Sequence, residues 1–207
     1  MKKAVFILFV LLLFSACNQS DKKQDMAEKE VAATENSAEN TELPELSIYH
    51  LPATWTTQNN EYIQLEDLRG NVLVMVMIYT SCKAACPRLI ADMRNIEKQV
   101  PGKYLGKTKF IMVSIDPETD TPQRLEAFAK ENEMEEDHWV FLRGTPEDTR
   151  EFATVLAVSY KKISPIDFSH SNIISVFDEE GVLVHQQEGL GVDNTETVEA
   201  IKTEISN

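Results

Sequence analysis

Positive charge is scarce in this chain. Its 207 residues carry 20 Lys and Arg side chains against 34 Asp and Glu, which gives a formal net charge of -14. Such a surface repels phosphate groups, so the composition argues against nucleic-acid binding and against direct adhesion to anionic lipid headgroups. It suits a cationic partner, although acidity also serves solubility, which is the more common reason for it.

Long apolar segments are also rare. The longest run, residues 4–14, is too short to span a bilayer comfortably. It follows two lysines at residues 2–3 and leads through small residues at 15–16 into Cys17, a pattern typical of a bacterial lipoprotein signal peptide. We expect cleavage before Cys17, lipidation of its thiol, and a location in the bacterial cell envelope, with the domain anchored by lipid on the non-cytoplasmic side of a membrane. An ordinary signal peptide and a retained membrane helix are the alternatives.

Composition divides the chain into three parts. Residues 1–16 are the predicted signal peptide, and residues 17–43 are the predicted lipidated cysteine and tether. The tether is rich in Asp, Glu, Lys, Asn, Ser and Ala and has almost no large apolar side chains. It cannot bury enough surface to fold, so we expect it to be disordered. The remaining residues, 44–207, are of normal size for one domain.

Cysteine is nearly absent from that domain. Apart from Cys17, the chain holds only Cys82 and Cys86. Two cysteines in an exported domain normally suggest a structural disulfide. A disulfide between residues this close would constrain the unfolded chain little. Metal binding or redox exchange is a better explanation of such a close pair of thiols.

The order of predicted elements favours an α/β fold. Strands alternate with helices along most of the domain, which predicts helices covering a central sheet, and no internal repeat is present. We predict a thioredoxin-like three-layer sandwich with an N-terminal β-hairpin extension, and an irregular loop at residues 161–169. The predicted strands are residues 47–50, 54–57, 62–65, 72–79, 109–115, 139–142, 172–177 and 182–187. The predicted helices are residues 88–100, 122–132, 146–156 and 194–205.

The two cysteines follow the most apolar predicted strand, residues 72–79. The carboxyl end of such a strand is where α/β sheets usually place their sites. In ideal helix the Cα atoms of Cys82 and Cys86 would lie roughly 6 Å apart, and their Cβ atoms about 5–6 Å apart, too far for a bond. The reduced pair therefore fits a regular turn, and oxidation requires backbone adjustment. A helix N-terminus and Lys83 would favour thiolate, and two thiolates select a soft ion, with Cu(I) the leading candidate.

Two sulfurs seldom complete a metal site, so a third ligand is expected among the four histidines. His50 lies before the core, His138 follows an acidic run and is expected at the surface, and His185 sits inside a predicted strand. His170 directly precedes a strand, and in a thioredoxin-like sheet its loop lies beside the cysteine turn. Spacing alone does not decide whether His170 is the third ligand, because a single histidine is usually not a metal ligand.

Three motifs together make residues 44–207 resemble the SCO/SenC family of thioredoxin-like copper proteins. They are C-x-x-x-C-P at Cys82, Cys86 and Pro87, D-P-x-x-D-T-P at residues 116–122, and H-S before a strand at His170. The resemblance implies that Cys82, Cys86 and His170 are copper ligands, for Cu(I), Cu(II) or both. It also implies a metallochaperone that assists assembly of the copper site of cytochrome c oxidase. Its partners would be a copper-accepting oxidase subunit and a thiol–disulfide reductant.

The sequence departs from the family pattern at two places. Lys83, Ala84 and Ala85 stand where the family usually has Pro after the first cysteine and often Asp between the pair, and Ser169 replaces the Asp that often precedes the histidine. These changes make the site less acidic and bear on partner choice and on the relative affinity for Cu(II).

Other thiol-based functions use the same residues. A membrane-anchored thiol–disulfide oxidoreductase acting on cysteines of exported proteins would use Cys82 and Cys86 as its redox pair, and this alternative stays open. A general thioredoxin would have C-x-x-C, which this chain lacks. A peroxiredoxin would have Thr or Ser three residues before the reactive cysteine, where this chain has Tyr79.

Overall fold

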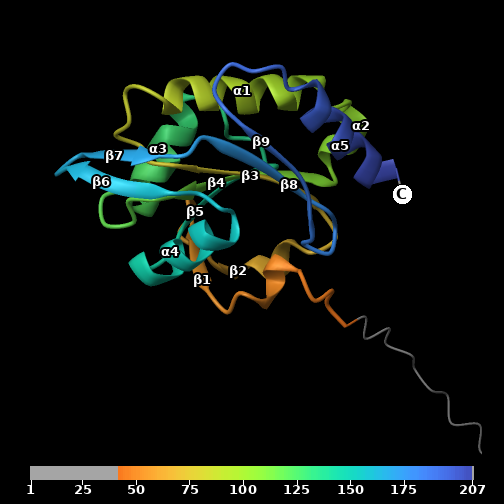
Figure 1. Cartoon of the computed structure of the whole chain (residues 1–207), viewed down its shortest axis with the longest axis horizontal. Helices are drawn as coiled ribbons and strands as arrows, with labels where there is room; N and C mark the ends of the chain where they lie inside the picture. Colours follow the sequence, from red (N-terminus) through yellow and green to blue (C-terminus); the bar gives the residue numbers. More distant parts are fainter. Residues whose placement is uncertain (1–41, 207) are drawn as a thin grey trace, which may run out of the picture. The chain divides into compact units, whose positions relative to one another are not determined.

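The computed structural model describes residues 42–206 (Figure 1). The predicted signal peptide, Cys17 and all but the last two residues of the predicted tether lie outside the described residues. Within them, Leu43, the last residue of the predicted tether, packs against the hydrophobic core. No helix in this described part is both long and apolar enough to cross a membrane.

A seven-stranded sheet forms the centre of the fold, in the order β2-β1-β5-β4-β3-β8-β9. β3 is an inner strand, with β4 paired to it in parallel on one side and β8 antiparallel on the other, and it is buried along its whole length. Continuous apolar sequence is expected for strands covered on both faces. The strands of this sheet are β1 (Thr54–Thr57), β2 (Tyr62–Gln64), β3 (Val72–Ile78), β4 (Thr108–Ser114), β5 (Trp139–Arg143), β8 (Ile173–Phe177) and β9 (Leu183–Glu188).

Helices cover both faces of the sheet, with α1 and α5 on one side and α4 on the other (Figure 1). α1 buries Leu89, Met93 and Ile96 at helical spacing, as expected for a helix with one face on a core. Thr121 and Thr145 cap α3 and α4 through their side chains, each followed by proline. The helices are α1 (Cys86–Gln99), α2 (Gly102–Leu105), α3 (Pro122–Glu131), α4 (Pro146–Val155) and α5 (Thr195–Ser206), with 3-10 helices at Ile48–His50 and Leu65–Leu68.

The predicted N-terminal hairpin is present, and it extends the main sheet. β1 pairs antiparallel with β2, and Thr56 and Thr57 continue the sheet by pairing with β5. The strand predicted at residues 47–50 is wrong, since Ile48–His50 is a 3-10 helix. The Ser47 hydroxyl accepts the backbone N–H of Tyr49, a local hydrogen bond that competes with strand pairing.

The irregular loop predicted at residues 161–169 is also wrong. β6 (Tyr160–Ser164) and β7 (Asp167–His170) pair antiparallel as a separate two-stranded sheet. Most of this hairpin is exposed, and β6 lacks the alternation of apolar and polar residues by which a half-buried strand is recognised, while β7 alternates over only four residues. His170 is therefore the last residue of a paired strand, which fixes its backbone.

Candidate metal centre

The turn between β3 and α1 carries both cysteines. β3 ends at Ile78, and α1 begins at Cys86 with Pro87 in its first turn. Proline is favoured there because the first N–H groups of a helix have no partner within it. Cys86 is 1% exposed, whereas Cys82 is half-buried. The carboxyl end of the central strand thus presents one accessible and one buried thiol.

Asp120 anchors the start of this turn. Its buried carboxylate accepts hydrogen bonds from Thr80 Oγ1 at 2.5 Å and Ser114 Oγ at 2.6 Å, and Arg124 Nε donates to Thr80 Oγ1 at 3.1 Å. Burial raises the pKa of Asp120, although the hydrogen bonds from Ser114 and Thr80 oppose this. The carboxylate ties the end of β3 to the end of β4, so the loop at residues 116–122 holds the cysteine turn in place.

The two thiols differ in acidity. Burial raises the pKa of Cys86. Burial also acts to raise the pKa of Cys82, but hydrogen bonds from the backbone and thiol of Cys86 and from the Ala84 backbone, together with the polar Tyr79 hydroxyl, outweigh it and lower the pKa. One of these, from Cys86 N to Cys82 Sγ, measures 3.3 Å. Both cysteines are free thiols, so the disulfide considered from the sequence is not formed between them in this structure.

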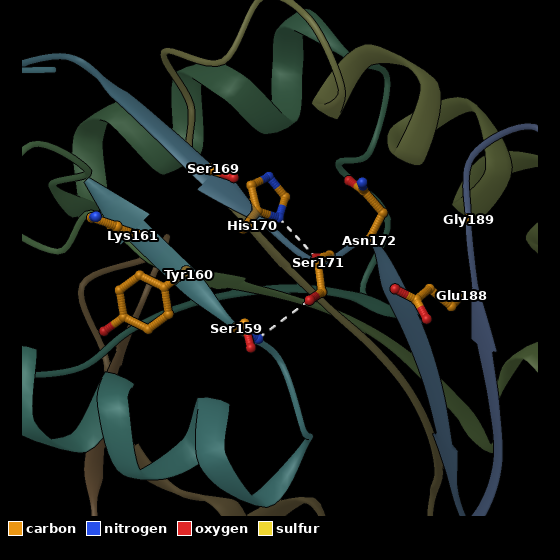
Figure 2. Close-up of a pocket in the computed structure, with 9 residues that line it drawn as sticks. All are labelled: Ser159, Tyr160, Lys161, Ser169, His170, Ser171, Asn172, Glu188 and Gly189. Atoms are coloured by element: carbon orange, nitrogen blue, oxygen red, sulfur yellow. Dashed lines mark hydrogen bonds between the residues drawn. The ribbon is translucent and has the colours of Figure 1, made fainter. Parts of the chain in front are cut away.

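His170 is held so that one ring nitrogen stays available. Its Nδ1 lies 2.9 Å from the carbonyl oxygen of Ser171, and the Ser171 hydroxyl accepts from Ser159 N at 3.3 Å (Figure 2). A carbonyl oxygen only accepts, so Nδ1 carries the proton and Nε2 keeps its lone pair in the neutral ring. Burial lowers the pKa of His170, although the hydrogen bond to Ser171 opposes this. The lowered pKa favours the neutral ring, which is the form that binds a metal ion.

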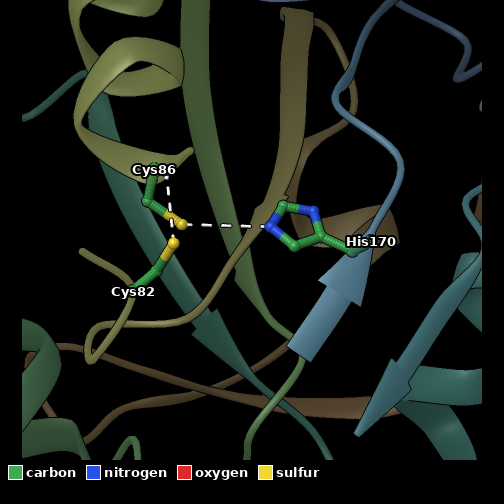
Figure 3. Close-up of side chains that lie close together, drawn as sticks. All are labelled: Cys82, Cys86 and His170. Atoms are coloured by element: carbon green, nitrogen blue, oxygen red, sulfur yellow. Dashed lines mark hydrogen bonds between the residues drawn. The ribbon is translucent and has the colours of Figure 1, made fainter. Parts of the chain in front are cut away.

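The three predicted ligands converge on one point (Figure 3). His170 Nε2 lies 4.0 Å from Cys86 Sγ, and the ligand atoms of Cys82, Cys86 and His170 all lie within 4.8 Å of one another. His170 comes from the end of β7, 84 residues beyond Cys86. Two sulfurs and one imidazole nitrogen form a donor set suited to a soft or borderline metal ion.

Tyr79 is a residue of the site whose contribution sequence reasoning missed. Its side chain is 1% exposed, and its hydroxyl donates to the Asp167 carboxylate while accepting from Phe168 N at 3.3 Å. The same hydroxyl lowers the pKa of Cys82. Its ring packs edge-on against His170, with ring centres 5.8 Å apart. Tyr79 thus connects the cysteine turn with the strand that carries His170, and no local pattern in the sequence indicates this.

We expect Tyr79→Phe to shift the alkylation of Cys82 by iodoacetamide to higher pH. The substitution removes the hydroxyl group that lowers the Cys82 pKa, so this pKa rises and less thiolate is present at a given pH. Mass spectrometry of the modified peptide as a function of pH measures this. Tyr160→Phe is the matched control, since Tyr160 also stacks on Phe168. Identical pH profiles for Tyr79→Phe and wild type would show that the hydroxyl does not act on Cys82.

The other three histidines have different partners. His50 Nε2 lies 2.9 Å from the Pro44 carbonyl oxygen, and His185 Nε2 lies 3.0 Å from Thr197 Oγ1. The prediction that His138 is a surface residue is wrong, because its side chain is only 14% exposed and its Nε2 lies 2.7 Å from Glu97 Oε1. Within the described residues, only His170 joins the cysteines in a possible metal-binding group.

Comparison with known protein families identifies the chain. The model of the family described as SCO1/SenC matches residues 47–206. The chain belongs to the SCO1/SenC family. The resemblance inferred from the three sequence motifs is thereby confirmed. A similar protein is the SCO1 protein homolog of Bacillus subtilis (strain 168), 33% identical over 103 residues. That match covers 49% of this chain and about half, 53%, of the relative's length.

Solved structures of SCO1/SenC proteins share the fold. The structure of BsSco, described as a member of the Sco family of cytochrome c oxidase assembly proteins with a disulfide switch, has a TM-score of 0.67 and 25% identity, covering 76% of this chain and 94% of BsSco. The copper-bound structure of ScoI from Bradyrhizobium japonicum has a TM-score of 0.61 and 25% identity, covering 73% of this chain and 96% of ScoI. The predicted α/β, thioredoxin-like fold class is confirmed.

Proposed function

We propose that this SCO1/SenC protein binds copper through Cys82, Cys86 and His170 and delivers it to the copper site of cytochrome c oxidase. The observation that carries the proposal is the convergence of two sulfurs and the free nitrogen of a neutral imidazole on one point. The copper-bound ScoI structure and the description of BsSco as an oxidase assembly protein support it. Copper is here a cargo, received and passed on.

The donor set suits copper in both oxidation states. Two thiolates suffice for Cu(I), whereas Cu(II) prefers a nitrogen donor and more ligands. The half-buried Cys82 and His170 give the site an accessible side for exchange with a partner, while the buried Cys86 holds its position. An accessible ligand is required when a metal ion is to be handed from one protein to another.

We expect cells that lack this protein to assemble oxidase with a depleted copper site and low oxidase activity. Wild type should restore the activity, and the Cys82→Ser, Cys86→Ser double variant should not, because serine hydroxyls are poor ligands for a soft ion. The measurement is copper content and activity of the isolated oxidase. Full copper occupancy in the deleted strain would rule out the delivery function.

A second function is favoured by the unequal acidity of the two thiols. A lowered pKa at Cys82 and a raised pKa at Cys86 fit a thiol–disulfide reductase. Cys82 thiolate would attack a target disulfide, and Cys86 would then displace the reduced target and leave a Cys82–Cys86 disulfide. A thiol–disulfide reductant must restore both thiols. Cells that lack the protein distinguish the two functions. Added copper should restore oxidase activity if the protein delivers copper, whereas an added dithiol should restore it if the protein reduces disulfides.

We also propose that residues 1–16 are removed as a signal peptide, that Cys17 is lipidated, and that residues 17–43 tether the domain of residues 44–207 to an envelope membrane. We expect the wild-type protein to fractionate with membranes and to carry acyl chains at its processed N-terminus. Cys17→Ser should release the protein or block processing, since the acylated thiol is lost. Membrane fractionation with mass analysis tests this. A soluble wild type with an unmodified N-terminus would contradict it.

A further inference from the structure

A second group of ligand side chains lies at the other end of α1. Glu97 belongs to the last turn of the helix, and Glu136 and His138 lie directly before β5. One ligand atom from each can be chosen so that all lie within 4.8 Å of one another. Eleven residues of helix separate Glu97 from Cys86, which amounts to about 16 Å along the axis, so the two groups share no ligand.

The two partly buried members of this group, Glu97 and His138, are held in place. Glu97 Oε1 accepts hydrogen bonds from His138 Nε2 at 2.7 Å and from Trp139 Nε1 at 3.1 Å. The His138 ring lies against Phe110 and Trp139, with ring centres 5.8 Å and 5.9 Å away. The His138 carbonyl accepts from Phe110 N at 2.8 Å, which fixes the backbone. Such outer contacts are the kind that orient ligands around a metal ion.

The carboxylates can also be reached from solvent. Glu97 and Glu136 both line a hollow at the end of α1, which gives an entering ion a path. Arg94 and Lys98 line it too. The Arg94 guanidinium forms a salt bridge of 2.6 Å with Glu133, so the Glu133 carboxylate offsets its positive charge. The exposed Glu136 side chain lies within reach of an ion held by Glu97 and His138.

We propose that Glu97, Glu136 and His138 form a second metal site, for a borderline divalent ion such as Zn²⁺ or Cu²⁺. In a tetrahedral zinc site with bonds of about 2.0–2.2 Å the ligand atoms lie about 3.3–3.6 Å apart. In this structure His138 Nε2 and Glu97 Oε1 lie 2.7 Å apart, and all three ligand atoms lie within 4.8 Å of one another. The tetrahedral spacing falls between these two values, so small movements of the side chains would create the site. Two carboxylates and one imidazole suit Zn²⁺ or Cu²⁺ and disfavour Cu(I), so this site differs in metal preference from the cysteine centre.

The bound ion would replace the proton on His138 Nε2 and join the end of α1 to the segment before β5. The ion would thus connect the far end of the helix that presents Cys86 to the start of β5, an inner strand of the sheet. Because binding to the folded state stabilises it, Zn²⁺ should raise the melting temperature as its concentration rises.

The test is calorimetric titration of the full chain with Zn²⁺, in a Cys82→Ser, Cys86→Ser background that removes the thiol centre. We expect one equivalent of Zn²⁺ to bind. Glu136→Gln and His138→Gln should each lower the Zn²⁺ affinity at least about tenfold, since loss of a contact that only orients a ligand already lowers metal affinity by that factor. Glu136 is exposed, so Glu136→Gln puts folding at little risk. Cu²⁺ bound beside Glu97 should quench Trp139 fluorescence, and His138→Gln should remove this quenching.

Glu135→Gln is the matched control. It makes the same charge change on a neighbouring exposed residue, and Glu135 lines a different hollow with Gln58 and Asn59. Its Zn²⁺ affinity should equal that of the parent. Absence of saturable Zn²⁺ binding, or equal losses for Glu135→Gln and Glu136→Gln, would overturn the proposal and leave a hydrogen-bonded His138–Glu97 pair. The thiol centre is absent from every variant here, so the outcome is independent of the proposed copper function.

Discussion

Replacing Cys82 and Cys86 by serine is expected to abolish tight copper binding. Serine nearly matches cysteine in size, so the 1% exposed position of Cys86 should accept it without a cavity. The hydroxyls cannot replace soft thiolates, and only His170 would remain as a ligand. Loss of outer contacts alone costs roughly 10–100-fold in metal affinity. We therefore expect Cu(I) affinity to fall by more than about a hundredfold.

Competition with a Cu(I) chelator, applied to the reduced protein, measures this loss. Ser81→Ala is the control, because Ser81 lies in the same turn and its hydroxyl donates only to the Ile166 carbonyl, at 3.3 Å. Circular dichroism of each variant checks the fold. If the double variant held copper as tightly as Ser81→Ala, the thiols would not be the ligands and the proposed function would fail.

Replacing His170 by alanine should weaken Cu(II) far more than Cu(I). Two thiolates can hold Cu(I), but Cu(II) prefers a nitrogen donor, which the Ser171 hydrogen bond leaves available on His170. We expect at least about a tenfold loss of Cu(II) affinity, by the scale of ligand-shell effects. The thiolate-to-Cu(II) charge-transfer absorption should also change, since the metal ion loses a ligand. Visible absorption and spin resonance at matched occupancy measure both effects.

The controls for His170 are the two histidines that lie in neither possible metal site. His50 contacts the Pro44 carbonyl and His185 contacts Thr197, so alanine at either position should leave the Cu(II) spectrum unchanged. A His170→Ala spectrum that matches these controls would remove His170 from the centre. The site would then be a redox pair of thiols on a thioredoxin-like scaffold, and the reductase function would be favoured.

The sequence by itself determined the parts of this protein that depend on near neighbours. The apolar run of β3 predicts a strand buried on both faces, because its pattern reports directly on burial. Thr121 and Thr145 predict helix starts through hydrogen bonds that span only three residues. The spacing of Cys82 and Cys86 places their sulfurs within one turn. The three motifs, taken together, indicated the family, and the resemblance to that family implied His170 as the third ligand.

Only the tertiary structure decided the contacts that join distant parts of the chain. His170 reaches the cysteines because β8 pairs with β3, which brings the end of β7 beside the turn, and periodicity carries no information on strand order. The Tyr79–Asp167 contact, across 88 residues, depends on the same pairing. The acidic residues before His138 led to the prediction that it is exposed. In the fold its ring contacts Glu97, which is 41 residues away in the sequence. Local pattern reports how buried a segment is, whereas the packing of whole elements selects which side chains meet.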